Sequence, residues 1–172
     1  MSPFRPDLVD VWVFRDGARP VFGTSSRPVI EILLRRRSPG RILPGLWQCV
    51  SGSLESGESV VAGALRELIE ETGFGAPEIL GLYDLDQVNQ FHEPSVAAIV
   101  SSAVFAVRVG PLAEPVLSHE HDAMQWSTPE QALRLAVWPA YRESIRRIAE
   151  NLLHPEVAIW FELTLDGQRA RR

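Results

Sequence analysis

Residues 52–74 read GSLESGESVVAGALRELIEETGF, a glycine-containing loop followed by a helical pattern. Apolar or small side chains recur here at the spacing of one helix face, which predicts that this face packs on a core. They are Val61, Ala64, Leu65, Leu68 and Thr72. Gly73 follows the last of them, where the pattern stops. The stretch therefore predicts a loop and an amphipathic helix.

Three glutamates share the side of this helix next to the apolar face. Glu67 and Glu71 are one turn apart and Glu70 lies between them, so their carboxylates converge. The spacing places no cationic side chain within the cluster, and like charges at this distance repel. A bound cation would explain the arrangement, because carboxylate oxygens suit Mg²⁺ or Mn²⁺ better than zinc. The alternative is a solvated acidic face, as charge runs usually are.

The fixed positions of the stretch favour a metal site. They follow the pattern Gly-x5-Glu-x7-Arg-Glu-U-x-Glu-Glu-x-Gly-U, where U is a bulky apolar residue. The residues that fill it are Gly52, Glu58, Arg66, Glu67, Leu68, Glu70, Glu71, Gly73 and Phe74. This pattern, called the box below, resembles the signature of the Nudix hydrolase family. The resemblance implies an α/β Nudix fold, a three-layer α/β/α sandwich with a mixed β-sheet, and attack of water on a diphosphate linkage assisted by Mg²⁺ or Mn²⁺.

The resemblance also implies roles for the charged residues of the box. Glu67 and Glu71 are the expected main metal ligands, with Glu70 as a third ligand or the general base. Arg66 and Glu58 are expected to pair and to fix the loop against the helix. For Glu58, solubility alone is the alternative.

Further contacts are expected around the box. The backbone carbonyl of Ser51 is a candidate for the metal shell, and Gly52 lets the backbone approach metal and phosphate. The cluster at 35–37, with Arg37 as the proposed contact, could meet an anionic substrate or could be a solvated strand end. Trp47 and Trp138 could stack on a base or pterin ring, although a lone Trp is more often in a core.

Residues 119–122 read His-Glu-His-Asp and allow two interpretations. Two histidines on one strand face suggest zinc, but no third His or Cys lies nearby in the sequence. Some Nudix enzymes draw a further acid from well downstream of the box. Glu120 stands at a corresponding place, which makes it an additional candidate metal ligand.

Composition limits the class of protein. The 172 residues, 45% of them apolar, suit one domain, 1–172, with a frayed tail from about residue 168. A net charge of −5 disfavours nucleic-acid binding. No apolar run approaches the length of a membrane span, and Cys49 is the only cysteine, so we expect a soluble, cytoplasmic protein. Whether it is a monomer or a homodimer stays open.

The remaining pattern predicts strands and helices that complete the sandwich. An irregular connection is expected at 17–28 and a polar break at 89–94. Helices are expected from Thr128 and after Pro139, the second ending at Pro155. The predicted strands are 8–14, 29–34, 46–51, 78–87, 95–109, 123–126 and 157–165, with 95–109 central and buried on both faces.

The substrate is less defined than the reaction. Residues 46–53 and 120–142 resemble the dihydroneopterin triphosphate diphosphatase branch of the family. A small nucleoside or pterin triphosphate that yields monophosphate and pyrophosphate is therefore the expected substrate. ADP-ribose or a dinucleotide is the alternative. A catalytically silent ligand-binding module, or a helix that binds a cation for structure alone, remains open.

Overall fold

The computed structural model describes residues 4–17 and 29–170, and the side chains from residue 7 onward within these ranges. The connection expected at 17–28 lies outside the described residues except for Gly17. Among the residues that the structure describes, no helix is both long and apolar enough to span a membrane.

Eight strands form one mixed sheet with the order β3-β2-β1-β6-β5-β8, while β4 pairs with β1 and β7 with β2. The parallel pair is β1 and β6, and the other pairs are antiparallel. The strands are β1 (Phe4–Asp16), β2 (Ile30–Arg37), β3 (Trp47–Gln48), β4 (Val50–Ser53), β5 (Ile79–Glu93), β6 (Ala98–Val109), β7 (His121–Ser127) and β8 (Glu162–Leu163). The predicted α/β class with a mixed sheet is confirmed.

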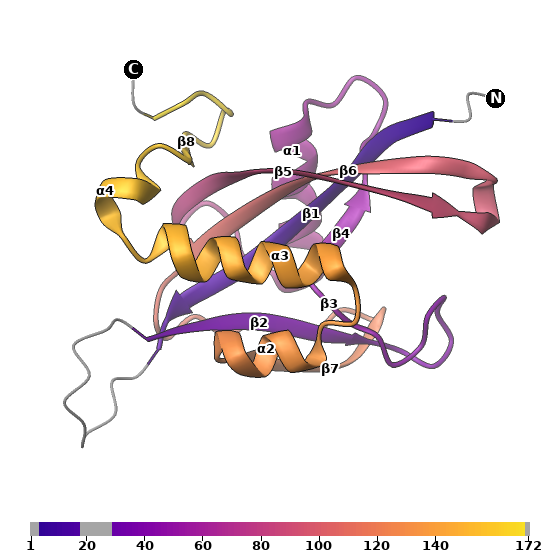
Figure 1. The fold of residues 1–172 in the computed structure, drawn as a ribbon, viewed down its shortest axis with the longest axis horizontal. Coiled ribbons are helices and arrows are strands. Elements are labelled where there is room, and N and C mark those ends of the chain that lie inside the picture. The colour runs from indigo at the N-terminus through magenta and orange to yellow at the C-terminus, as the bar shows by residue number, and fades with distance from the viewer. Residues whose placement is uncertain (1–3, 18–28, 171–172) are drawn as a thin grey trace.

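Helices cover both faces of the sheet (Figure 1). One face carries α1 (Val60–Thr72), and the other carries α2 (Pro129–Leu135), α3 (Pro139–Arg147), the π-helical turn η2 (Ile148–Leu152) and α4 (Pro155–Ala158). Alternate residues of β1 serve the two cores: Val9 and Val11 pack on the α1 side, whereas Trp12 and Phe14 pack on the α3 side. The result is the predicted three-layer sandwich.

The helix of the box forms as its sequence predicts. The Ser59 hydroxyl accepts a hydrogen bond from the backbone N–H of Ala62, which caps the start of α1. Gly73 adopts φ +76° and ends the helix in the left-handed region. The predicted apolar face is also present: Ala64 and Leu68 are buried in the core on this side.

Several predicted boundaries were wrong. Strand β5 runs through the expected polar break, because residues 88–93 pair with β6. A 3₁₀ turn, η1 (Pro94–Val96), then delays the start of β6 to Ala98. Once started, β6 lies between β1 and β5 and is largely buried, as expected for a central strand.

The C-terminal region differs most from expectation. The helical stretch of α3 and η2 ends at Leu152, before Pro155 as expected. Pro155 also begins α4, which we did not predict, since proline suits the first helical position, where no N–H is required. The strand predicted at 157–165 shrinks to the two residues of β8. Near the end of the described residues, the N–H of Ala170 donates to the carbonyl of Glu162.

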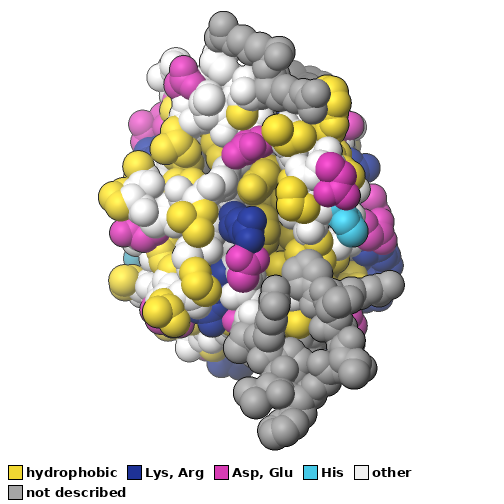
Figure 2. All heavy atoms as spheres, turned by 90° about the vertical axis from the view of Figure 1, so that its left-hand side faces the viewer, with side chains coloured by type: hydrophobic (Ala, Val, Ile, Leu, Met, Phe, Trp, Pro, Cys, Tyr) yellow, Lys and Arg dark blue, Asp and Glu magenta, His cyan; other side chains and the backbone are white. Residues whose placement is uncertain are grey.

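One end of the sheet has a hollow of about 470 Å³. Figure 2 shows the side of the molecule where α4 lies, with apolar side chains around one basic and one acidic group near its centre. Arg108 pairs with Asp16 at this end, Nη2 to Oδ1 being 2.7 Å, and both line the hollow. The lining contains no residue of the box, so this hollow is not the expected reaction site.

Candidate active site

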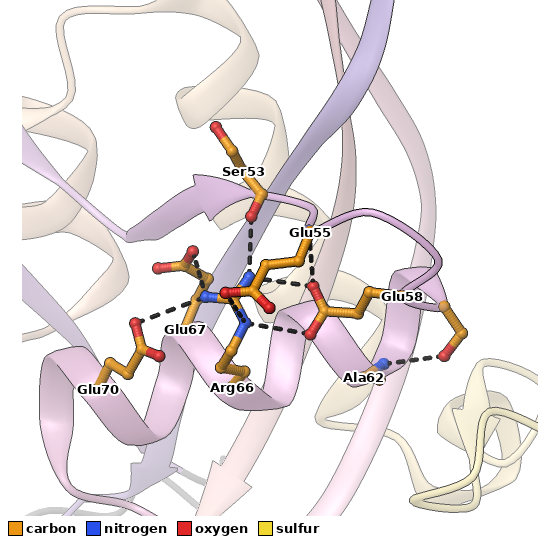
Figure 3. A network of polar contacts seen from close by, with 8 residues as sticks. Ser53, Glu55, Glu58, Ala62, Arg66, Glu67 and Glu70 are labelled. Carbon is orange, nitrogen blue, oxygen red and sulfur yellow. Dashed lines mark hydrogen bonds and ion pairs between the residues drawn. The ribbon is translucent and has the colours of Figure 1, made fainter.

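Arg66 connects the helix of the box to the loop before it (Figure 3). Its Nε and Nη2 each donate to one carboxylate oxygen of Glu58, both at 3.0 Å. Nη2 also donates to the carbonyl of Ser53 at 2.8 Å. The Arg66 guanidinium holds the pKa of the Glu58 carboxyl below its usual range. The pairing that we predicted for Arg66 and Glu58 is thus present and fixes the loop on α1.

The same guanidinium approaches two further acids of the cluster. Its Nη1 lies 2.8 Å from Oε1 of Glu67 and 3.5 Å from Oε2 of Glu70. The Glu67 side chain is 13% exposed and that of Glu70 is 57% exposed, so Glu70 is the more accessible acid. Figure 3 shows Glu58 and Glu67 on opposite sides of the Arg66 guanidinium. Our expectation that no cation lies within the cluster was therefore wrong.

A second arginine holds Glu71. Arg35 of β2 has Nη2 at 2.7 Å from Oε2 of Glu71, and the Arg35 side chain is only 1% exposed. The backbone N–H of Ser51 donates to the same oxygen at 3.3 Å. Burial raises the pKa of the Glu71 carboxyl, and the charge and hydrogen bond of Arg35 oppose that rise. The sequence allowed the cluster at 35–37 a substrate contact or a solvated strand end, and for Arg35 the buried contact with Glu71 replaces both.

The acids and the backbone before α1 share one pocket of about 380 Å³. It brings Glu120, which precedes β7, to the same space as the glutamates of α1. The lining residues are Ser51, Gly52, Ser53, Glu67, Glu70, Glu71, Ser118, His119 and Glu120. Glu120 is held at its rim by Arg41, with Nη1 at 3.4 Å from Oε1. Sequence reasoning did not single out Ser53 or Ser118, which become neighbours of the acids only through the fold.

Three predicted substrate contacts lie outside this lining. Arg37 donates from Nε to the carbonyl of Ile42 at 2.6 Å and so secures the loop after β2. Trp47 packs against the core on the α3 side. Trp138 occupies the N-cap position of α3 without a capping hydrogen bond from its side chain, and its ring is exposed. A contact of Arg37, Trp47 or Trp138 with substrate stays a prediction.

The two histidines near Glu120 do not share a strand face as expected. His119 lies in the turn before β7, whereas His121 begins β7 and is buried. The His121 ring lies 3.2 Å from Nε2 of Gln48 and 3.0 Å from Oγ of Ser118. Burial, assisted by nearby arginines, lowers the pKa of His121 to about 3. A neutral, hydrogen-bonded structural histidine explains this position without zinc.

The pocket fits a hard divalent cation. Its ionisable donors are mainly carboxylates, and the described ion pair and hydrogen bonds of Glu71 use Oε2, which leaves Oε1 for a cation. Within the described residues 4–17 and 29–170, no group of three Asp, Glu, His or Cys side chains converges tightly enough to hold a metal ion without further ligands. Water, backbone carbonyls or substrate oxygens would therefore have to complete the shell, as is usual for Mg²⁺.

Comparison with known proteins agrees with the fold. A family model described as NUDIX domain matches residues 9–148, a range that includes the box and Glu120. The chain therefore belongs to the NUDIX family.

Two curated relatives match at the sequence level. A protein named octanoyltransferase, from Myxococcus xanthus, is 40% identical over 122 residues, which are 70% of this chain and 32% of that protein. A CTP pyrophosphohydrolase from Escherichia coli strain K12 is 32% identical over 110 residues, which are 64% of this chain and 76% of that protein. The chain thus matches about a third of the length of the Myxococcus relative, and the name octanoyltransferase belongs to that whole, longer protein.

Solved structures show the same fold. A NUDIX hydrolase from Listeria monocytogenes superimposes with a TM-score of 0.67 at 22% identity, covering 86% of this chain and 94% of that one. The dihydroneopterin triphosphate pyrophosphohydrolase of Escherichia coli does so with a TM-score of 0.58 at 22% identity, covering 81% of this chain and 95% of that one. At these identities the likeness establishes the fold and not the substrate.

Proposed function

We propose that this chain hydrolyses a nucleoside or pterin triphosphate to a monophosphate and pyrophosphate with a divalent cation, Mg²⁺ or Mn²⁺. The observation that carries the proposal is the pocket in which Glu67, Glu70 and Glu71 of α1 meet Glu120 and the backbone of Ser51. Support for a nucleotide comes from the 32% identity with a CTP pyrophosphohydrolase.

Each acid has a distinct place in this proposal. Glu67 and Glu71 are held by arginines, so they are fixed enough to act as the main ligands. Glu70 is the more exposed and serves as a third ligand or as the general base. Glu120 approaches from the side of β7 and would ligate only by leaving or sharing its contact with Arg41. When bound, the cation would shield the phosphate charge and lower the pKa of the attacking water.

Residues around the acids orient the reaction. Gly52 and Ser53 follow Ser51 along the pocket wall, where backbone groups can approach a phosphate closely. Arg66 fixes the wall by bonding to Ser53 while it holds Glu67. Phosphoryl transfer depends mainly on such positioning and on charge stabilisation, so a rigid wall should favour the reaction.

A substrate panel tests the proposal. Purified protein is incubated with about 5 to 10 mM Mg²⁺, above typical Mg²⁺ affinities, and with CTP, other ribo- and deoxynucleoside triphosphates, dihydroneopterin triphosphate, ADP-ribose and dinucleoside polyphosphates. Pyrophosphate and monophosphate are read separately, and Glu67→Gln reports any contaminating activity. We expect a triphosphate to release pyrophosphate. Cleavage confined to ADP-ribose or dinucleotides would show that the substrate is not a triphosphate. No cleavage of any compound in the panel would favour a ligand-binding module.

A further inference from the structure

Arg35 is the most completely buried charged side chain among the residues described, at 1% exposure. It lies two residues after Leu33 on β2, and both face the helix of the box. A guanidinium this deeply buried is costly unless its donors are satisfied. Its contacts therefore indicate why an arginine stands at this position.

Three segments meet at this guanidinium. Nη2 donates to Oε2 of Glu71 at 2.7 Å and to the carbonyl of Cys49 at 2.8 Å. Nη1 donates to the backbone carbonyl of Glu71 at 3.4 Å. Arg35 thus ties β2 to the residue just before β4 and to the last turn of α1. It fixes the same glutamate through both its side chain and its backbone.

The last turn of α1 carries negative charge that no cationic side chain within that turn compensates. This turn contains Glu70 and Glu71 and no basic residue, so both the helix dipole and the acids leave it negative. Arg66, one turn earlier, is occupied by Glu58, Glu67 and Glu70. Among the residues that the structure describes, Arg35 is the cationic side chain that forms an ion pair with Glu71.

We propose that Arg35 is a positioning residue for the reaction, one that holds Glu71 by Oε2 so that Oε1 serves the divalent cation. This inference rests on the proposed function, which makes Glu71 a metal ligand. It extends the box, because the residue that orients one of its acids comes from a neighbouring strand. The planar fork of arginine suits the task, since it bonds Glu71 and Cys49 at once.

Mn²⁺ binding to the metal-free protein distinguishes this positioning role from an effect of charge alone and from a contribution to fold stability alone. Free Mn²⁺ is measured by electron paramagnetic resonance during a titration, so no turnover is needed. Arg35→Lys keeps the charge and loses the fork, whereas Arg35→Gln removes the charge. If Arg35 positions Glu71, both variants bind Mn²⁺ more weakly, by about ten-fold, which is the usual effect of losing a partner of a metal ligand.

The other roles predict different results. If Arg35 acted by charge alone, Arg35→Gln would bind Mn²⁺ more tightly, because a cation that repels the metal is gone. If Arg35 only stabilised the fold, both variants would melt at lower temperature and bind Mn²⁺ with wild-type affinity. Either result would overturn the inference. Should one variant fail to fold, the other still decides between these outcomes.

A double-variant cycle separates failure of the inference from failure of the proposed function. In the Glu71→Gln background, Arg35→Lys should change Mn²⁺ affinity no further, because Arg35 acts through Glu71. If Glu71→Gln alone binds Mn²⁺ like the wild type, the ligand assignment fails instead. If it weakens binding while the Arg35 variants do not, only the role of Arg35 is wrong.

Arg15→Lys is the matched control. Arg15 is also largely buried and paired, with Nε at 2.8 Å from Oε2 of Glu31, but it lies beyond Leu8–Val11, the part of β1 that pairs with β4. It stacks over the ring of Trp126 at 4.0 Å. Its replacement should lower the melting temperature without changing Mn²⁺ affinity. A loss of affinity equal to that of Arg35→Lys would show that any paired arginine has this effect.

Discussion

The carboxylate of Glu67 lies directly against the backbone of Gly52. A methyl group at position 52 would come within 1.9 Å of Cδ of Glu67 and 2.1 Å of its Oε1. Real side chains essentially never approach so closely, so no other residue fits at 52 unless Glu67 moves. Gly52, the first glycine of the box, therefore leaves the space that the carboxylate of Glu67 occupies.

We predict that Gly52→Ala folds but loses about 100-fold in kcat/KM, the scale expected when a catalytic group is displaced by about 1 Å. The Glu67 side chain can move away by giving up its contact with Arg66, so the fold should tolerate the methyl group. Steady-state kinetics and a melting curve check this. Gly40→Ala is the control, because nothing lies within 4 Å of a Cβ there. Wild-type kinetics in Gly52→Ala would refute the role of this contact.

Glu58→Gln should raise the Mg²⁺ concentration needed for half-maximal rate by on the order of ten-fold, because the bidentate partner of Arg66 is lost. Arg66 would then hold Glu67 and the carbonyl of Ser53 less firmly. Glu55→Gln is the matched control, since Glu55 is exposed and lies 4.0 Å from Arg66. A Mg²⁺ titration in which both variants match the wild type would assign Glu58 to solubility alone.

Glu120→Gln should slow turnover less than Glu71→Gln. Glu120 is partly exposed and bound to Arg41, whereas Glu71 is buried beneath the pocket and fixed by Arg35. Rates at saturating Mg²⁺ give the comparison. A Glu120 variant as fast as the wild type would return this residue to the surface acids, and one slower than Glu71→Gln would reverse the assigned order.

His121 should make the fold sensitive to acid. Its pKa is about 3 in the folded protein and 6.5 in an ordinary environment, so the unfolded chain takes up a proton that the folded chain refuses. The stability from neutral His121 is therefore complete above pH 6.5 and is lost as the pH falls toward 3. Between pH 7 and pH 5 the loss should be about 1 to 2 kcal/mol.

Urea unfolding of the metal-free protein at several pH values checks this. His121→Gln should flatten the pH dependence of the free energy of unfolding in this range, because the glutamine side chain does not titrate. His154→Gln is the control, since His154 is exposed. Parallel curves for wild type and His121→Gln would show that His121 is not the source of acid sensitivity.

The local features of the box could be predicted from sequence because they depend on residues close together in the chain. The Gly73 stop and the apolar face of α1 follow from helical spacing in the sequence. The Arg66–Glu58 pair, which joins the loop to α1, was implied by the family resemblance. The predicted fold class likewise follows from strand and helix patterns that the family resemblance organises.

Contacts between distant segments could not be predicted in the same way. We ended β2 at Leu34 because arginines suggested a solvated strand end, yet β2 continues to Arg37. The alternation from Leu33 to Arg35 was the available signal for a buried arginine. Its partner Glu71 lies 36 residues away, and no local pattern connects the two. Residues 157–165 misled us because their alternation resembled a strand, although Pro155 begins a helix.

The most direct test of the central claim is the rate of pyrophosphate release by Glu71→Gln at saturating Mg²⁺, on the best substrate found for the wild type. Glu143→Gln on α3 is the control, an acid paired with Arg147 one turn away. We predict that Glu71→Gln keeps the wild-type circular dichroism spectrum and loses at least about 100-fold in rate, as expected when a ligand of the cation that stabilises the developing charge is removed. A folded Glu71→Gln variant that releases pyrophosphate at the wild-type rate would contradict the account.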